Sequence, residues 1–187
     1  MKITPLKIPD VFLIEPKVFG DDRGFFFESY NARELTRALG SQHDFVQDNH
    51  SKSRQGVLRG LHYQIAPQAQ GKLVRVVAGE IFDVAVDLRK ASPSFGQWVG
   101  ARLSSQNHHQ LWIPQGFAHG FLTLSDATEV LYKTTDFYAP SLERAIRWDD
   151  PQLAIDWPLT PEEKVHVLVS EKDAQAPAFG HAVYFET

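Results

Sequence analysis

Apolar and polar residues alternate along residues 79–89, GEIFDVAVDLR. Phe82 and Val84, with the apolar residues that follow at the same spacing, point to one side, whereas Asp83 and Asp87 point to the other. This period of two predicts a β-strand. The two carboxylates are then either buried inside a barrel or exposed to solvent, and the pattern alone does not decide between these alternatives.

Further short apolar segments lie between turn residues and predict more strands. The turn at 20–24 separates two apolar runs and predicts a hairpin over 17–30, with the aromatic run 25–27 mostly in the core. Other predicted strands cover residues 11–14, 45–49, 57–61, 97–104, 111–113, 116–124 and 129–135, with a polar loop over 50–55. Many short strands at regular turn spacing predict an all-β antiparallel barrel or sandwich.

One segment carries a clear helix signal. Asn31 can cap a helix start, Glu34 follows three residues later, and Leu35 and Leu39 share a face before Gly40 ends the helix. The residues after Trp148 are rich in proline and charge, so we expect irregular structure with one helical turn. We expect a single domain over residues 1–187, with a largely irregular tail from about residue 158.

Composition limits the possible functions. Hydrophobic residues make up 43% of the chain and charged residues 22%, and the net charge of −4 disfavours a nucleic-acid-coating protein. The absence of cysteine excludes disulfides and thiolate metal sites. The first residues lack an apolar signal core, and no apolar run reaches the roughly 18 residues that cross a bilayer. We therefore expect a cytoplasmic protein that binds neither nucleic acid nor membrane.

The candidate chemistry is concentrated in residues 56–72, GVLRGLHYQIAPQAQGK. Arg59, His62 and Lys72 can bind an anion, move a proton or stabilise a developing negative charge. Taken alone, His62 is better explained as a buried histidine of a hairpin.

A second stretch, residues 113–121, has a P-x-G-x-x-H spacing that ends at His119 and resembles the second motif of the cupin barrels. Many cupins hold a metal through an H-x-H pair, but Tyr63 and Gln64 follow His62 here. His62 with His119 is too small a ligand set for a first-row metal, and the adjacent His108 and His109 would point to opposite faces of a strand. We expect no metal and no cofactor.

The ordered motifs along the chain resemble the dTDP-4-dehydrorhamnose 3,5-epimerase family. The segments that carry the resemblance are PKVFGDDRGFFFESYN (16–31), FVQDNHSKS (45–53), VLRGLHYQ (57–64), QGKLVRV (70–76), FDVAVDLR (82–89), SPSFGQW (92–98), LWIPQGFAHGF (111–121) and LYKTTDFY (131–138). The resemblance implies a cupin-type double-stranded β-helix, or jelly roll. It also implies cofactor-free inversion of C3 and C5 of dTDP-4-dehydro-6-deoxy-D-glucose, in dTDP-L-rhamnose biosynthesis.

The resemblance also implies roles for individual residues. His62 matches the family's general base, and Asp173, in a C-terminal S-x-K-D pattern, matches the carboxylate that orients it. Tyr132 matches the general acid and Lys72 the cation that stabilises an enolate oxygen. The matching substrate-binding positions are Arg23, Glu28, Gln47, Asp48, Asn49, Arg59, His119, Tyr138, Glu143 and Lys172. Tyr138 among them can stack on the thymine.

The family resemblance further implies a homodimer, in which the hairpin around Arg23 crosses to the partner subunit.

Three other functions are compatible with parts of the sequence. They are an epimerase that inverts one centre only, a metal-dependent sugar-phosphate isomerase of the cupin type, and a cupin that binds a nucleotide sugar without catalysis.

Overall fold

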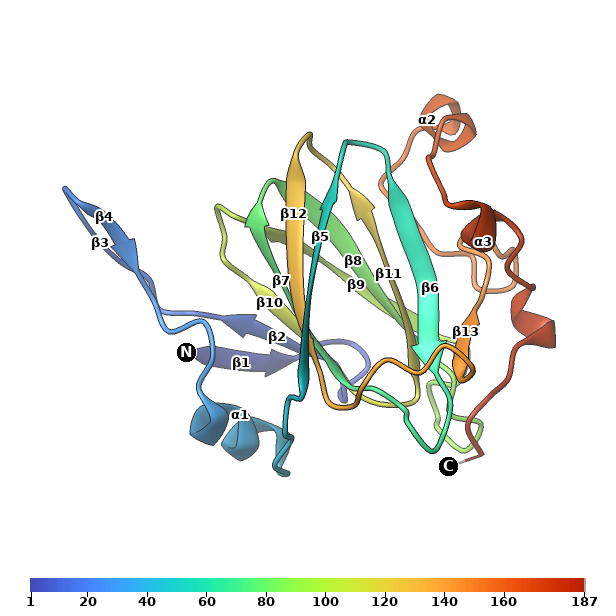
Figure 1. Cartoon of the computed structure of the whole chain (residues 1–187), viewed down its shortest axis with the longest axis horizontal. Helices are drawn as coiled ribbons and strands as arrows, with labels where there is room; N and C mark the ends of the chain where they lie inside the picture. Colours follow the sequence, from blue (N-terminus) through green and yellow to red (C-terminus); the bar gives the residue numbers. More distant parts are fainter. Residues whose placement is uncertain (187) are drawn as a thin grey trace.

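The computed structural model describes residues 1–186, and they form two antiparallel sheets that face each other (Figure 1). The six-stranded sheet has the order β1-β2-β10-β7-β12-β5 and the five-stranded sheet the order β13-β6-β11-β8-β9. The strands are β1 Lys2–Pro5, β2 Phe12–Glu15, β5 Gln47–Ser53, β6 Leu58–Gln64, β7 Lys72–Ala78, β8 Glu80–Asp87, β9 Trp98–Ser104, β10 Gln110–Ile113, β11 Phe117–Thr123, β12 Thr128–Thr134 and β13 Glu143–Ala145. The predicted all-β jelly roll with few short helices is confirmed.

The five-stranded sheet is buried on both faces. Along β8, Ile81 and Ala85 pack between the two sheets, whereas Val84 and Val86 pack in a second cluster on the other side, with Trp157 of the tail. Asp83 and Asp87 are fully buried, which settles in favour of burial the alternative that the alternation left open.

The predicted helix is confirmed as α1 (Ala32–Leu39). The Asn31 side chain accepts a hydrogen bond from the Glu34 N–H, and the Gly40 N–H donates to Thr36 O. Gly40 has a φ of 74°, which glycine adopts without a steric penalty. Leu35 is the buried residue of the helix.

Several elements depart from the predictions. The predicted loop over 50–55 is wrong for its first half, because β5 continues to Ser53 by pairing with β12 along its length. The tail contains two short helices, α2 (Pro161–Val165) and α3 (Glu171–Ala174), and a 3₁₀ turn, η1 (Phe179–His181), instead of one helical turn. Local caps at Thr160 and Ser170 start the two helices.

The predicted hairpin is present as β3 (Phe19–Asp21) and β4 (Gly24–Phe26), and it projects away from the sheets (Figure 1). The prediction that its aromatic run is mostly core is wrong within one chain, since Phe25 is 64% and Phe26 68% exposed. The ring centroid of His108 lies 4.8 Å from that of Phe25. A projecting segment with exposed aromatic rings is typical of an interaction surface.

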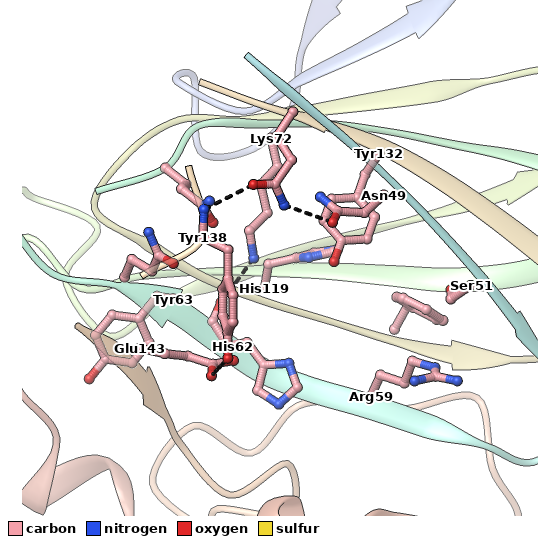
Figure 2. A pocket seen from close by; sticks show the side chains of 14 residues that line it. Asn49, Ser51, Arg59, His62, Tyr63, Lys72, His119, Tyr132, Tyr138 and Glu143 are labelled. Carbon is pink, nitrogen blue, oxygen red and sulfur yellow. Dashed lines mark hydrogen bonds between the residues drawn. The ribbon is translucent and has the colours of Figure 1, made fainter. Parts of the chain in front are cut away.

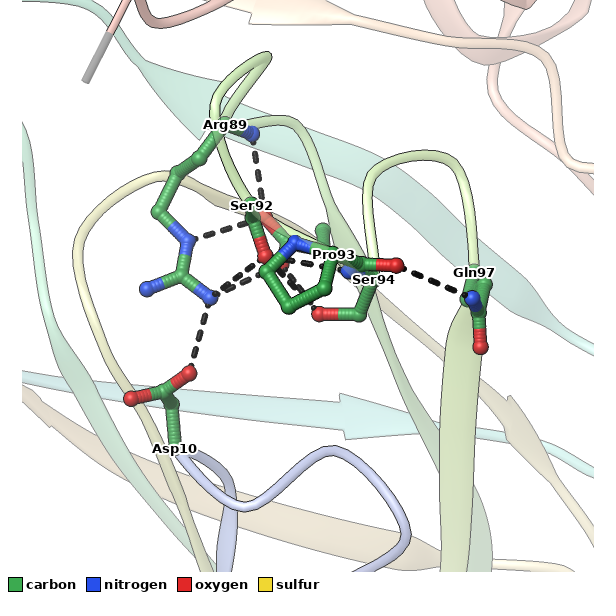
Figure 3. A network of polar contacts seen from close by, with 7 residues as sticks. Asp10, Arg89, Ser92, Pro93, Ser94 and Gln97 are labelled. Carbon is green, nitrogen blue, oxygen red and sulfur yellow. Dashed lines mark hydrogen bonds and ion pairs between the residues drawn. The ribbon is translucent and has the colours of Figure 1, made fainter.

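A buried ionic network fixes the loop between β8 and β9 (Figure 3). Asp87 accepts hydrogen bonds from Arg89 Nε at 2.9 Å, Ser92 Oγ at 2.6 Å and Ser94 Oγ at 2.7 Å. Burial raises the pKa of the Asp87 carboxyl, but these donors together lower it by a larger amount. The pKa therefore lies below its ordinary value. Arg89 also donates to Asp10 at 2.9 Å and thereby ties this loop to the N-terminal segment.

We expect Arg89→Met to lower the free energy of unfolding by about 2–3 kcal/mol, because it leaves the buried Asp87 carboxylate without its cation. Urea unfolding followed by circular dichroism measures this change. Arg102→Met is the matched control, since Arg102 on the edge strand β9 forms an exposed ion pair with Glu80 and such pairs contribute little. Equal losses in the two variants would contradict the assignment of stability to the Asp87 network.

Candidate active site

A cavity of about 370 Å³ opens between the two sheets (Figure 2). Its walls come mainly from β5, β6, β7, β11, β12 and β13. The lining residues are Gln47, Asn49, Ser51, Arg59, His62, Tyr63, Gln64, Gln70, Lys72, His119, Phe121, Tyr132, Tyr138 and Glu143. The cavity therefore gathers most of the residues that the sequence nominated from five separate segments of the chain.

His62 is bound to a carboxylate of the tail. Its Nε2 lies 2.5 Å from Oδ1 of Asp173, which is only 3% exposed. Ser170 caps α3 by accepting a hydrogen bond from the Asp173 N–H at 3.1 Å, and this fixes the start of the helix that carries Asp173. Burial raises the pKa of the Asp173 carboxyl, but His62, the Gly60 N–H and Ser170 together lower it by more, so the carboxyl is ionised at neutral pH.

Lys72 extends from β7 to the same cavity. Its Nζ donates to His62 O at 3.3 Å, and the residue is 7% exposed. Burial lowers the pKa of Lys72 to about 8, and attraction to Asp83 and Glu143 opposes that shift. The amine is thus a cation at neutral pH that releases its proton more readily than an exposed lysine does.

A second histidine–carboxylate pair lies on the adjacent strands. His119 Nε2 is 2.7 Å from Asp83 Oδ1, and both residues are buried. Burial lowers the pKa of His119, and the attraction of Asp83 offsets part of the shift. The other oxygen of Asp83 has no hydrogen-bond partner within the described residues. Asp83 was not nominated from the sequence, although its inward position in the alternation of β8 was the available signal.

Tyr132 lies on β12, and its ring centroid is 6.5 Å from that of His119. Burial raises the pKa of the Tyr132 hydroxyl, so it carries its proton at neutral pH. On the neighbouring strand, alternation turns Gln47 and Asn49 into the cavity and Asp48 outward, where Asp48 pairs with Lys133. The structure therefore does not bring the Asp48 side chain to the cavity.

The polar groups at one end of the cavity are connected. Tyr138, which is 53% exposed, donates its hydroxyl proton to Glu143 Oε2 at 2.8 Å, and Lys172 binds the same oxygen. In the view of Figure 2, Arg59 lies on the opposite side of His62 from Glu143. Arg59 donates to Ser53 Oγ at 3.1 Å, which holds its guanidinium beside the cavity.

Besides Asp48, two nominated residues of the hairpin region lie away from the cavity of their own chain. Arg23 is at the tip of the projecting hairpin, where its 90% exposed side chain binds Asp21. Glu28 accepts a hydrogen bond from Asn31 next to α1. Arg23 thus lies in the hairpin turn, and Glu28 lies in the segment between the hairpin and α1.

The described residues 1–186 contain no cluster of metal ligands and no membrane-spanning helix. No three side chains of His, Asp or Glu in this range converge in a way that would ligate a metal ion. None of the short helices in the described residues has the length or apolarity needed to span a bilayer.

The family model described as dTDP-4-dehydrorhamnose 3,5-epimerase matches residues 5–181. The chain belongs to this family. It is 65% identical over 185 residues to the dTDP-4-dehydrorhamnose 3,5-epimerase of Pseudomonas aeruginosa, with 99% of each chain covered. It is 56% identical to that of Salmonella typhimurium, with 100% of each chain covered.

Solved structures agree with this assignment to the epimerase family. A dTDP-6-deoxy-D-glucose-3,5-epimerase from Legionella pneumophila, crystallised in complex with dTDP-4-keto-L-rhamnose, is 53% identical. It superposes with a TM-score of 0.91 and covers 97% of this chain and 94% of its own. The predictions of the family, of its fold and of an epimerase of dTDP-L-rhamnose biosynthesis are confirmed.

We expect the Lys72 amine to lose its proton near pH 8, because burial disfavours the charged form. Heteronuclear NMR of protein labelled in its lysine side chains gives a midpoint for each amine, and the resonance missing from Lys72→Met identifies Lys72. A midpoint at about 10, the range of an exposed lysine, would contradict the burial argument.

Proposed function

We propose that the chain inverts C3 and C5 of dTDP-4-dehydro-6-deoxy-D-glucose, with His62 as base and Tyr132 as acid. These roles are supported by the way in which side chains are arranged around one cavity. A histidine bound to a buried carboxylate, a protonated tyrosine and a buried cation all line or adjoin it. Family membership supplies the substrate class, and the cavity supplies the chemistry.

The substrate's C4 ketone explains why these groups suffice. C3 and C5 both flank the ketone, so removal of either proton gives an enolate. Return of a proton to the opposite face of the sugar then inverts the centre. The reaction needs a base on one face, an acid on the other and positive charge at the enolate oxygen. No electron leaves the substrate, so no redox cofactor takes part.

The Asp173 carboxylate determines which nitrogen of His62 acts. Because Asp173 is ionised, His62 Nε2 carries a proton and donates it to the carboxylate, so Nδ1 accepts the proton of C3 or C5. The carboxylate also stabilises the imidazolium that forms. Asp173 thus acts through His62 and not on the sugar.

Lys72 provides the positive charge for the enolate oxygen. Its amine is held beside His62 in a water-poor site, where electrostatic stabilisation is stronger than in bulk water. The His119–Asp83 pair lies in the same part of the cavity, and we assign His119 to binding of the sugar. Tyr132, on β12 of the facing sheet, returns the proton.

Different residues of the cavity bind the diphosphate and the thymine of the substrate. Arg59 suits phosphate oxygens geometrically, and the exposed Tyr138 ring offers a surface for the thymine. Gln47, Asn49, Glu143 and Lys172 complete this set of polar contacts. Asp48 is not part of this set, because its side chain points away from the cavity and pairs with Lys133.

The chain acts as a homodimer in this proposal. Arg23 and Glu28 lie in or next to the projecting hairpin, and its exposed rings support a partner subunit that covers them. Transfer of this segment to a second subunit would bring a cation and a carboxylate to the partner's cavity and bury those rings. Each site then combines residues of two chains.

We expect His62→Ala to abolish exchange of the C3 and C5 protons with solvent, a loss of about 10²–10⁴-fold or more. Proton NMR of the substrate in deuterated water, without added metal or cofactor, measures exchange at each carbon. Exchange at both carbons by the unaltered chain supports double epimerisation. Exchange at one carbon alone would replace it with single epimerisation, and normal exchange by His62→Ala would remove His62 as the base.

Tyr132→Phe provides the contrast in the same experiment. Since Tyr132 acts after deprotonation, this variant keeps the exchange of substrate protons but forms little inverted product. Normal product formation by Tyr132→Phe would exclude Tyr132 as the acid.

For the dimer we expect complementation between Arg23→Ala and His62→Ala chains. When the two chains are coexpressed in equal amounts and pair at random, about half of the dimers are mixed. Each mixed dimer has one intact site, so about a quarter of all sites are intact. Epimerase activity near that fraction supports crossing of the hairpin. Activity no higher than that of the separate variants would contradict it.

A further inference from the structure

The loop after β12 is held by side chains from both sheets. Residues 136–139 have no regular secondary structure, and Tyr138 within them is largely exposed. Loops of this kind are ordinarily mobile. Here Gln64 of β6 and Gln47 of β5 bind the backbone on both sides of Tyr138.

Gln64 makes three hydrogen bonds with one amide. Its Nε2 donates to Phe137 O at 3.1 Å and to Gln68 O at 2.7 Å, and its Oε1 accepts from Ala139 N at 2.8 Å. Gln64 is 3% exposed. Both N–H groups and the oxygen of the amide are therefore used, and a carboxylate at this position would lose both donors.

Gln47 completes the attachment from the other sheet. Its Oε1 accepts from Tyr138 N at 2.9 Å, and its Nε2 donates to Asn49 Oδ1 at 2.9 Å (Figure 2). The Tyr138 hydroxyl is bound in turn by Glu143 at 2.8 Å. The ring is thus fixed at its backbone and at its tip, while much of its surface stays open to solvent.

We propose that Gln64, together with Gln47, is a positioning residue that presents Tyr138 as a preformed stacking surface for the nucleotide base. This inference deepens the proposed function and rests on it. A ring that is fixed before binding loses little conformational freedom when a base stacks on it, and the affinity gains accordingly. Gln64 acts through Tyr138 and takes no part in proton transfer.

The test is calorimetric binding of two ligands, dTDP and inorganic pyrophosphate, to the whole chain and to two variants. Gln64→Leu is neutral and removes all three bonds, whereas Gln64→Glu keeps the acceptor for Ala139 N and serves if the leucine variant fails to fold. We expect dTDP affinity to fall roughly tenfold or more, as for loss of base stacking. Pyrophosphate has no base, so its affinity should stay within about twofold of that of the unaltered chain.

A second measurement tests whether Gln64 acts through Tyr138. In the Tyr138→Ala background, Gln64→Leu should change dTDP affinity no further, because the surface that Gln64 positions is already absent. A merely structural glutamine would lower the melting temperature equally in both backgrounds and leave the preference for dTDP over pyrophosphate unchanged.

Three results would overturn the proposal. They are unchanged dTDP affinity in the Gln64 variants, equal losses for dTDP and pyrophosphate, and additive effects of the Gln64 and Tyr138 substitutions. Failure of the unaltered chain to bind dTDP at all would instead overturn the proposed function, and the inference with it.

Discussion

The hydrogen bond between His62 and Asp173 joins a central strand of the barrel to a segment 111 residues later in the chain. It forms because the tail is attached to the same strand. Leu168 exchanges backbone hydrogen bonds with Gly56 and Leu58 at 2.9 Å, and Trp157 and Phe179 pack on the outer face of the five-stranded sheet. The apolar contacts thus provide the binding energy that holds a carboxylate against a half-buried imidazole.

That geometry concentrates ionisable groups in a space with little water. Two histidine–carboxylate pairs and Lys72 lie at or beside the cavity. The carboxylates lower the cost of burying positive charge, whereas Lys72 and His62 disfavour a second cation at His119. The compensation is incomplete at Asp83, one oxygen of which has no partner within the described residues. A polar centre of this kind is tolerable because two packed apolar clusters surround it on either side of the sheet.

The sequence predicted what depends on local pattern. Alternation identified β8, an apolar segment between turn residues identified β11, and the cap residues Asn31 and Gly40 gave the limits of α1. It could not predict contacts set by chain topology: the exposure of Phe25 and Phe26, the burial of Asp83 beside His119, and the extension of β5. Family motifs nominated His62, Lys72 and Tyr132, which line one cavity. Gln64 escaped notice because its importance lies in backbone groups more than 70 residues away.

The order of synthesis gives the tail a further consequence. The strands of both sheets, the last of which ends at Ala145, leave the ribosome before α3 does. Because domains begin to fold during translation, a nascent barrel can form while its histidine still lacks the carboxylate that orients it. In the proposed mechanism, catalytic competence therefore arises late in translation, after the barrel strands have been made, and a chain interrupted near residue 170 would lack the carboxylate that orients His62.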